Sequence, residues 1–129
     1  MTTAIEEQQV LDTIDRWVEK EVRPIARRFD QADEYPADLV EQMKELGLFG
    51  ATIGGLGLSA STYARVVTRI AQAWMAPTGI FNSHLIMAAC VERHGTEEQK
   101  QRYLPRFATG ELRGGSGLTE PNAGTDLQG

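Results

Sequence analysis

Apolar side chains recur every three or four positions along much of the chain, a spacing that predicts helices rather than strands. Thr3 and Glu6 have the spacing of a capping box, so a long amphipathic helix is expected to begin after Thr3. Pro24 lies inside this helix and has no N–H to donate, which predicts a kink or break near Val22 and Arg23. The apolar positions of this stretch are Val10, Ile14, Trp17, Val18, Val22, Ile25 and Phe29.

Residues typical of helix starts and helix ends then mark two further helices. Pro36 stands where the first position of a second helix is expected, and Gly47 has the place of a residue that ends it. A glycine-rich loop follows. Ser59 or Ser61 is expected to cap a third helix, which continues through Trp74.

Two more helices complete the predicted set. Pro77 opens a fourth helix, which should end before Gly95. Thr96 and Gln99 form a second capping box, which predicts the start of a fifth helix. Pro105 falls inside this last helix, so we expect the helix to bend or end at the residue before it.

The fold class predicted by this pattern is all-α. Nothing before Gly114 alternates β-branched and polar residues as a strand does, and the first candidate strand falls at 114–119. We therefore expect a bundle of about five helices over residues 1–113 and a short strand or loop fragment over residues 114–129.

Length, charge, cysteine count and hydropathy limit the classes of function that this chain can have. A chain of 129 residues is the size of one domain, and its net charge of −5 argues against a nucleic-acid surface, which needs clustered Lys and Arg. The single cysteine, Cys90, cannot form an internal disulfide and suits a reducing compartment. The first ten residues resemble neither a secretory signal nor a basic transit peptide, and no apolar stretch is long enough to span a bilayer. We expect a cytoplasmic protein.

Candidate metal and acid–base residues are few. Cys90 and His94 would share a helix face, but no second pair completes a metal site, so none is predicted. His84 lacks a visible nucleophile or orienting group and is not assigned as a general base. The large aromatic residues have helical spacing and are expected in the core, namely Trp17, Phe29, Trp74, Phe81 and Phe107.

The run from Gly115 to Asp126 concentrates small residues, hydroxyls and one proline. Glycine allows a ligand to approach the backbone closely, and Pro121 fixes one φ angle. Thr119 and Thr125 supply hydroxyl groups that can donate to a carbonyl or a ring nitrogen. On chemistry alone the run is either a turn between two elements or a loop that holds a ligand.

This run resembles the flavin-site signature of the acyl-CoA dehydrogenase family in the segment Leu118-Thr119-Glu120-Pro121-x-Ala123-Gly124-Thr125-Asp126. Several upstream motifs resemble the same family's helical amino-terminal domain and occur in the same order. Motifs that are spaced in the right order form a more specific signal than any one alone. They are Leu46-Gly47-Leu48-Phe49-Gly50, Gly95-Thr96-Glu97-Glu98-Gln99-Lys100, Tyr103-Leu104-Pro105 and Gly110-Glu111.

The resemblance implies a flavoprotein that holds FAD and oxidises a fatty acyl-CoA to the trans-2-enoyl-CoA. It also implies an electron-transfer flavoprotein as redox partner and a homo-oligomer. In the family an α-helical domain precedes a small β domain and a four-helix domain, so the chain would cover the first and the edge of the second. The implied flavin contacts are Ser116, Gly117, Leu118, Thr119, Glu120, Pro121, Asn122, Ala123, Gly124 and Thr125, with Thr125 also touching the acyl-CoA.

The fourth predicted helix carries a stripe of small and polar residues at Gly79, Asn82, Ser83 and Ile86. Such a stripe is either a contact between helices or, by the resemblance, the far end of an acyl pocket. In the second interpretation Gly79, Asn82 and Ile86 contact the substrate, and Asn82 closes the pocket.

One departure from the family concerns the loop: members usually carry an extra Pro-acidic-acidic-aromatic stretch between the positions of Ile53 and Gly54. The family's catalytic glutamate is expected beyond residue 129, and Glu120 is not assigned that role. Two hypotheses follow. The chain is part of an acyl-CoA dehydrogenase and is not active alone, with weak or absent FAD binding, or it is a stand-alone helical interaction module derived from that family.

Overall fold

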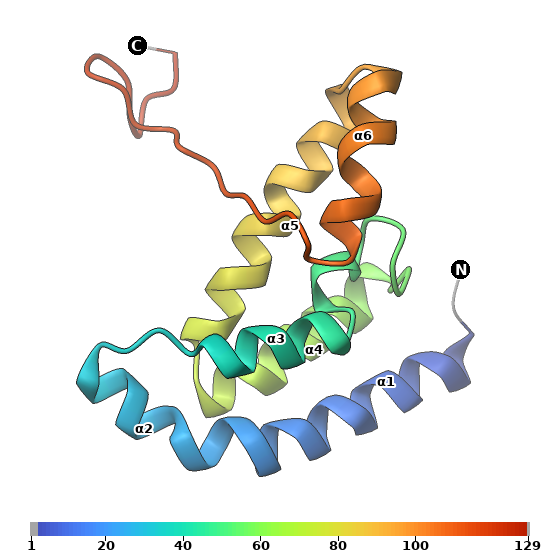
Figure 1. Cartoon of the computed structure of the whole chain (residues 1–129), viewed down its shortest axis with the longest axis vertical. Helices are drawn as coiled ribbons and strands as arrows, with labels where there is room; N and C mark the ends of the chain where they lie inside the picture. The colour runs from blue at the N-terminus through green and yellow to red at the C-terminus, as the bar shows by residue number, and fades with distance from the viewer. Residues whose placement is uncertain (1–2, 129) are drawn as a thin grey trace.

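The first two α-helices follow one curved path along one edge of the molecule (Figure 1). The computed structural model describes residues 3–128, and the prediction of about five helical bodies is confirmed because a short π-helix joins α1 to α2. The elements are α1 (Ala4–Trp17), the π-helix η1 (Val18–Val22), α2 (Arg23–Ala32), α3 (Ala37–Glu45), the 3₁₀ turn η2 (Leu48–Gly50), α4 (Ala60–Ala73), α5 (Ala76–His94) and α6 (Glu97–Ala108).

The break expected before Pro24 takes the form of η1. The N–H of Arg23 donates to the carbonyl of Val18, five residues earlier, so the helix is locally wider than an α-helix. Pro24 lacks the N–H that the carbonyl of Lys20 would need, and a π-turn absorbs this defect without ending the helix. The predicted position is confirmed, and the path continues into α2.

The capping signals correspond to real contacts. The Thr3 side chain accepts from the N–H of Glu6 at 3.2 Å, and the Thr96 side chain accepts from the N–H of Gln99 at 3.2 Å. Ser59, rather than Ser61, caps α4 by accepting from the N–H of Thr62 at 3.3 Å. Each cap satisfies an N–H group that lacks a partner within its helix.

Pro105 does not end α6, and this part of the prediction is wrong. The helix continues to Ala108. The Pro105 ring is exposed and lies with Gln101 beside an open hollow. The carbonyl of Gln101, which loses its helical donor to the proline, therefore lies on a side of the helix that water can reach. A solvated carbonyl costs little, which allows the helix to continue.

The core lies where α4 packs between α1 and α5, while α5 in turn packs against α6. The short turn η2 contacts α3, α5 and α6, and its Phe49 is fully buried. Burial of the predicted aromatic residues is confirmed for four of the five, whereas Phe29 is only partly buried against the core. The buried four are Trp17, Trp74, Phe81 and Phe107.

The glycine-rich loop after η2 is closed at its base by two glycines. Gly55 donates its N–H to the carbonyl of Gly50 at 2.9 Å. A Cβ on Gly55 would collide with that carbonyl oxygen, and a Cβ on Gly50 would lie 2.6 Å from the carbonyl oxygen of Ala108. Side chains are therefore excluded from both positions. At the tip, Gly54 has a φ of 97°, and no atom lies within 4 Å of the place that a Cβ would take.

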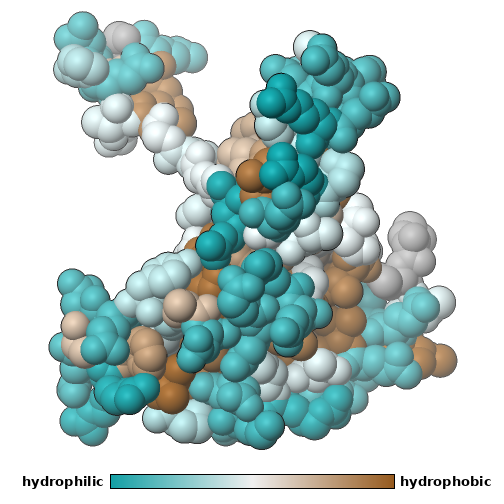
Figure 2. Space-filling model, viewed as in Figure 1, coloured by the Kyte–Doolittle hydropathy of each residue, from teal (hydrophilic) through white to brown (hydrophobic). Residues whose placement is uncertain are grey.

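The residues after α6 leave the helical body and cross α5 before they project away from it (Figure 1). Of the two forms expected at 114–119, a strand or a loop, the structure shows the loop, because these residues are extended without forming a strand. A strand needs a neighbour to pair its N–H and C=O groups, and the described residues supply none there. Figure 2 shows the segment standing apart, with polar and apolar side chains both on its surface.

Candidate functional site

The predicted flavin motif forms a turn held by a few backbone hydrogen bonds. The N–H of Glu120 donates to the carbonyl of Ala123 at 2.7 Å, and the return bond measures 3.3 Å. Pro121 and Asn122 occupy the two central positions, where a fixed φ and a short polar side chain both favour a turn. Gly124 then donates to the carbonyl of Asp126 at 3.3 Å. The motif is thus locally ordered although it lies outside the helical body.

The residues before this turn present unused donors. Ser116, Gly117, Leu118 and Thr119 are all exposed, and their backbone N–H groups bond to no other described residue. A Cβ on Gly117 would meet nothing within 4 Å, so the backbone here is open to close approach. Free N–H groups and hydroxyls suit a planar group that presents carbonyl oxygens and ring nitrogens, so these residues fit the ring of a flavin.

The second predicted cluster lies on the exposed face of α5. Gly79, Asn82, Ser83 and Ile86 are all exposed, and the Ile86 side chain is 54% accessible. A Cβ on Gly79 would meet nothing within 4 Å, so no other helix of residues 3–128 covers the stripe at this point. The structure leaves this face open to a ligand or to protein outside the described range.

Tyr63, on α4, is a member of this cluster that the sequence did not reveal. Its hydroxyl donates to Oδ1 of Asn82 at 2.7 Å. Burial raises the pKa of Tyr63 to about 12, so the hydroxyl stays protonated and remains a donor at physiological pH. No local signal on α4 marks this tyrosine, because the partner is fixed only when α4 packs against α5.

His84 lies on the inner side of the same helix. It is 1% exposed, and its Nε2 lies 3.0 Å from the carbonyl oxygen of Phe107. Its Nδ1 accepts from the N–H of Gly114 at 3.3 Å. Burial lowers the pKa of His84, hydrogen bonds to Phe107 and Phe49 oppose this effect, and the charge of Arg113 adds to it. A general-base role, which no sequence signal supported, does not suit a side chain sealed in this way.

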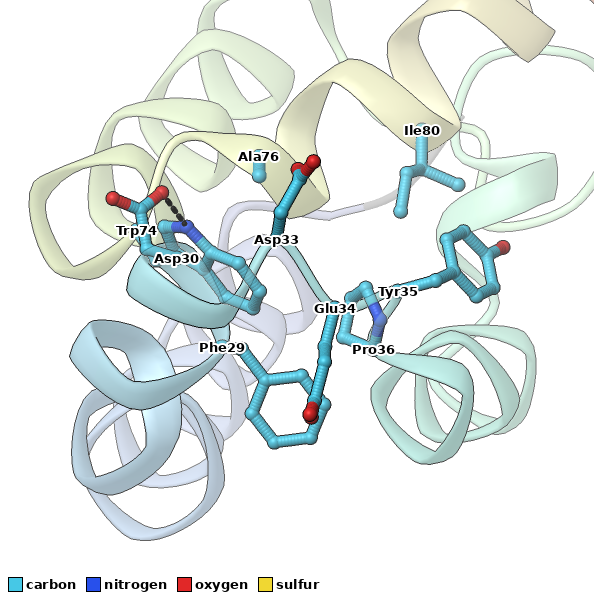
Figure 3. A pocket seen from close by; sticks show the side chains of 9 residues that line it. All are labelled: Phe29, Asp30, Asp33, Glu34, Tyr35, Pro36, Trp74, Ala76 and Ile80. Atoms are coloured by element: carbon cyan, nitrogen blue, oxygen red, sulfur yellow. Dashed lines mark hydrogen bonds between the residues drawn. The ribbon is translucent and has the colours of Figure 1, made fainter.

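A separate hollow of about 330 Å³ lies where the end of α2 and the turn after it meet the start of α5 (Figure 3). One of its carboxylates is already engaged, because Asp30 accepts from Nε1 of Trp74 at 3.0 Å. The hollow contains none of the predicted flavin or acyl contacts. Its lining consists of Phe29, Asp30, Asp33, Glu34, Tyr35, Pro36, Trp74, Ala76 and Ile80.

Residues 3–128 contain no group of three or more His, Cys, Asp or Glu side chains that could hold a metal ion, and Cys90 is exposed and unpaired. Over the same range no helix is both long enough and apolar enough to cross a membrane.

The family is established by comparison with known proteins. The family model of the acyl-CoA dehydrogenase N-terminal domain matches residues 4–111. The chain is 36% identical to a short-chain specific acyl-CoA dehydrogenase of Clostridium acetobutylicum, over 94% of this chain and 33% of that protein. It is 37% identical to an acryloyl-CoA reductase (NADH) of Anaerotignum propionicum, over 93% of this chain and 32% of that protein. The chain therefore belongs to the acyl-CoA dehydrogenase family, and the resemblance of its motifs is confirmed.

Solved structures agree. Butyryl-CoA dehydrogenase from Megasphaera elsdenii matches with a TM-score of 0.84 and 27% identity, over 98% of this chain and 35% of that one. A glutaryl-CoA dehydrogenase from Mycobacterium smegmatis in complex with FADH2 matches with a TM-score of 0.77 and 26% identity, over 98% of this chain and 34% of that one. A chain in a structure of the electron transferring flavoprotein of Acidaminococcus fermentans matches with a TM-score of 0.85 and 30% identity, over 98% of this chain and 35% of that one. The chain thus spans about a third of the length of these relatives.

Proposed function

We propose that this chain supplies the helical wall and the flavin-ring contacts of an enzyme that oxidises acyl-CoA thioesters to trans-2-enoyl-CoA. The observation that carries the proposal is the open row of donors at 116–119 followed by the ordered turn at 120–123. The reaction removes a proton from the α-carbon and a hydride from the β-carbon, and bound FAD supplies the hydride acceptor. We assign no catalytic base within residues 3–128.

In this proposal the backbone of Leu118 and the Thr119 hydroxyl bind the pyrimidine side of the flavin ring. The remaining residues of the range Ser116–Thr125 surround it, and Thr125 also contacts the acyl-CoA. Fixed N–H and O–H groups cost no reorganisation when charge develops on the ring, which is how such contacts assist a reaction. The Mycobacterium smegmatis relative in complex with FADH2 supports a flavin as the ligand.

The exposed stripe on α5 is proposed as the far end of the acyl pocket. Gly79 leaves room for an alkyl chain, because there is open space where a Cβ would stand. Ile86 supplies apolar surface, and Asn82, held by Tyr63, closes the pocket with a polar group. An alkyl chain that reached the amide would displace water from it without offering a hydrogen bond, at a cost of roughly 1–3 kcal/mol.

We further propose that the enzyme is a cytoplasmic homo-oligomer that passes electrons to an electron-transfer flavoprotein. The structural relative from Acidaminococcus fermentans supports this choice of partner. The alternative is a stand-alone, non-catalytic interaction module. In that case the motif at 118–126 would have no ligand, whereas the dehydrogenase gives it one.

The test uses a full-length enzyme that carries this segment, built as a chimera with the Megasphaera elsdenii relative. We expect a yellow protein that reduces an artificial electron acceptor when given acyl-CoA. Thr119→Val should weaken flavin retention, whereas Thr52→Val, at an exposed threonine of the loop after η2, should not. A colourless, folded and inactive enzyme would favour the interaction module.

A further inference from the structure

The buried imidazole of His84 joins the helical body to the segment that leaves it. One ring nitrogen faces α6 through the carbonyl of Phe107, and the other faces the N–H of Gly114, the first residue of the extended segment. Gly114 also lies directly against α5, where a Cβ would come 2.7 Å from Cε of Met87. The segment therefore leaves the helices at a point fixed by one hydrogen bond and one close contact.

Three backbone groups act on the ring: the carbonyls of Phe107 and Phe49 favour its protonated form, whereas the N–H of Gly114 needs an unprotonated Nδ1. A backbone N–H can only donate, so Nδ1 must present its lone pair to Gly114. A carbonyl can only accept, so Nε2 must carry the proton that bonds to Phe107. Only the neutral ring with its proton on Nε2 satisfies both Gly114 and Phe107. An imidazolium would place an N–H at Nδ1 against the N–H of Gly114 and break that bond.

Burial of His84 outweighs the two carbonyls and favours the uncharged form, so the pKa of the ring is lowered. The rings of Phe49 from η2 and Phe107 from α6 face it edge-on, with centroid distances of 5.3 and 5.6 Å. The charge that acts on it within the described residues is the cation of Arg113, which opposes protonation. Lys44 of α3 forms an ion pair with Glu41 of the same helix, and Arg106 of α6 forms one with Glu111.

We propose that His84 is a positioning residue that fixes the segment 114–128 against α5, and that protonation of His84 releases this segment. In the neutral state the segment is held at Gly114. In the protonated state the bond is lost, and the turn that carries the flavin motif is no longer held in register with the helices. The inference rests on the proposed function only for the flavin contacts assigned to this segment. The hydrogen bond between His84 and Gly114 does not depend on any ligand.

The decisive measurement is NMR of the 129-residue chain over a range of pH. The ring nitrogens of His84 should show the proton on Nε2 at neutral pH. The Gly114 amide should shift as His84 titrates, with a midpoint below the ordinary value of 6.5. Exchange protection of that amide, corrected for intrinsic rates, should fall about tenfold per pH unit between the two pKa values.

Matched variants separate this from general destabilisation. His84→Gln keeps a neutral group that can accept and donate, so the Gly114 amide should lose its pH response while the chain remains folded. His94→Gln removes the exposed histidine of the same helix and should leave the response intact. A proton on Nδ1, or a Gly114 amide that titrates alike in the wild type and in His84→Gln, would overturn the inference. Failure of the chain to contact a flavin would not affect these results.

Discussion

The hydroxyl of Tyr63 and the amide of Asn82 form a hydrogen bond of 2.7 Å between α4 and α5. This bond turns Oδ1 of Asn82 toward the protein and fixes the amide on an otherwise open helix face. The amide is therefore preorganised before any ligand arrives. A role for Asn82 in selecting the length of the substrate's acyl chain therefore depends on Tyr63 as well.

In the full-length enzyme, Asn82→Ala should shift preference toward longer acyl chains. The substitution removes the polar group and opens space, and each well-fitted methylene is expected to gain about tenfold or more in kcat/KM. The measurement is a profile against straight-chain acyl-CoAs of increasing length. Glu92→Gln, at an exposed residue of α5 outside the stripe, is the control and should not change the profile. Coinciding profiles for Asn82→Ala and the wild type would assign Asn82 to packing alone.

Gly79→Ala should affect stability and activity in opposite directions. Gly79 lies inside α5 with free space around it, so alanine should stabilise the helix by about 1 kcal/mol in urea unfolding of the 129-residue chain. In the full-length enzyme the added methyl group would narrow the proposed pocket and raise KM for longer substrates. A more stable chain with unchanged kinetics would remove Gly79 from the pocket.

The 129-residue chain alone should bind FAD weakly or not at all. One exposed loop offers only a few of the contacts that a dinucleotide needs, and its extended residues lack strand neighbours. Titration of flavin fluorescence with the purified chain tests this. Micromolar or tighter affinity would show that residues 116–125 bind the cofactor without further domains.

Folding stability should fall as pH drops below about 6.5. The pKa of His84 is lowered in the folded state, so the unfolded chain binds a proton more readily, and stability present above 6.5 is lost toward the folded pKa. Urea unfolding at pH 7.5, 6.5 and 5.5 should show this loss in the wild type and not in His84→Gln. The exposed carboxylates of Glu6 and Glu19 have pKa values lowered below 4.5, so their contribution disappears only in more acidic solution. A flat wild-type profile from pH 7.5 to 5.5 would contradict the assignment.

The 129-residue chain should self-associate at high concentration. Met75 is 73% exposed, Ile86 is 54% exposed, and both lie on or beside α5. Exposed apolar surface of this kind favours association. Sedimentation over a concentration series should show species larger than the monomer, and Met75→Gln combined with Ile86→Gln should reduce them. A single monomeric species at every concentration would exclude this behaviour.

Local signals predicted the helices well because their causes are local. A cap such as Thr96 bonds to an N–H three residues away, so its spacing in the sequence contains the whole interaction. Pro24 marked the right position for the same reason. The prediction that Pro105 would end α6 was wrong because its effect depends on whether water reaches the carbonyl of Gln101. Only the packed structure decides this.

The site was only partly predictable. The motif at 118–126 is marked by its composition, and the stripe on α5 by its spacing. Tyr63 and His84 carry no such mark, because their partners, Asn82 and Gly114, are 19 and 30 residues away along the chain. Such pairs form only when helices dock, and the choice among many possible partners is made by packing rather than by local propensity.

The loop after η2 has a sealed base and an open tip, and this makes it a natural place to lengthen the chain. The contact between Gly50 and Gly55 resists any substitution, whereas Gly54 has empty space around it. Beside it lies a hollow of about 430 Å³, bounded by the loop and by Lys100, Gln101, Leu104, Pro105 and Ala108 of α6. Residues added between Ile53 and Gly54 would enter this hollow without altering a helix, so the fold can accept a longer loop here while its helical body stays unchanged.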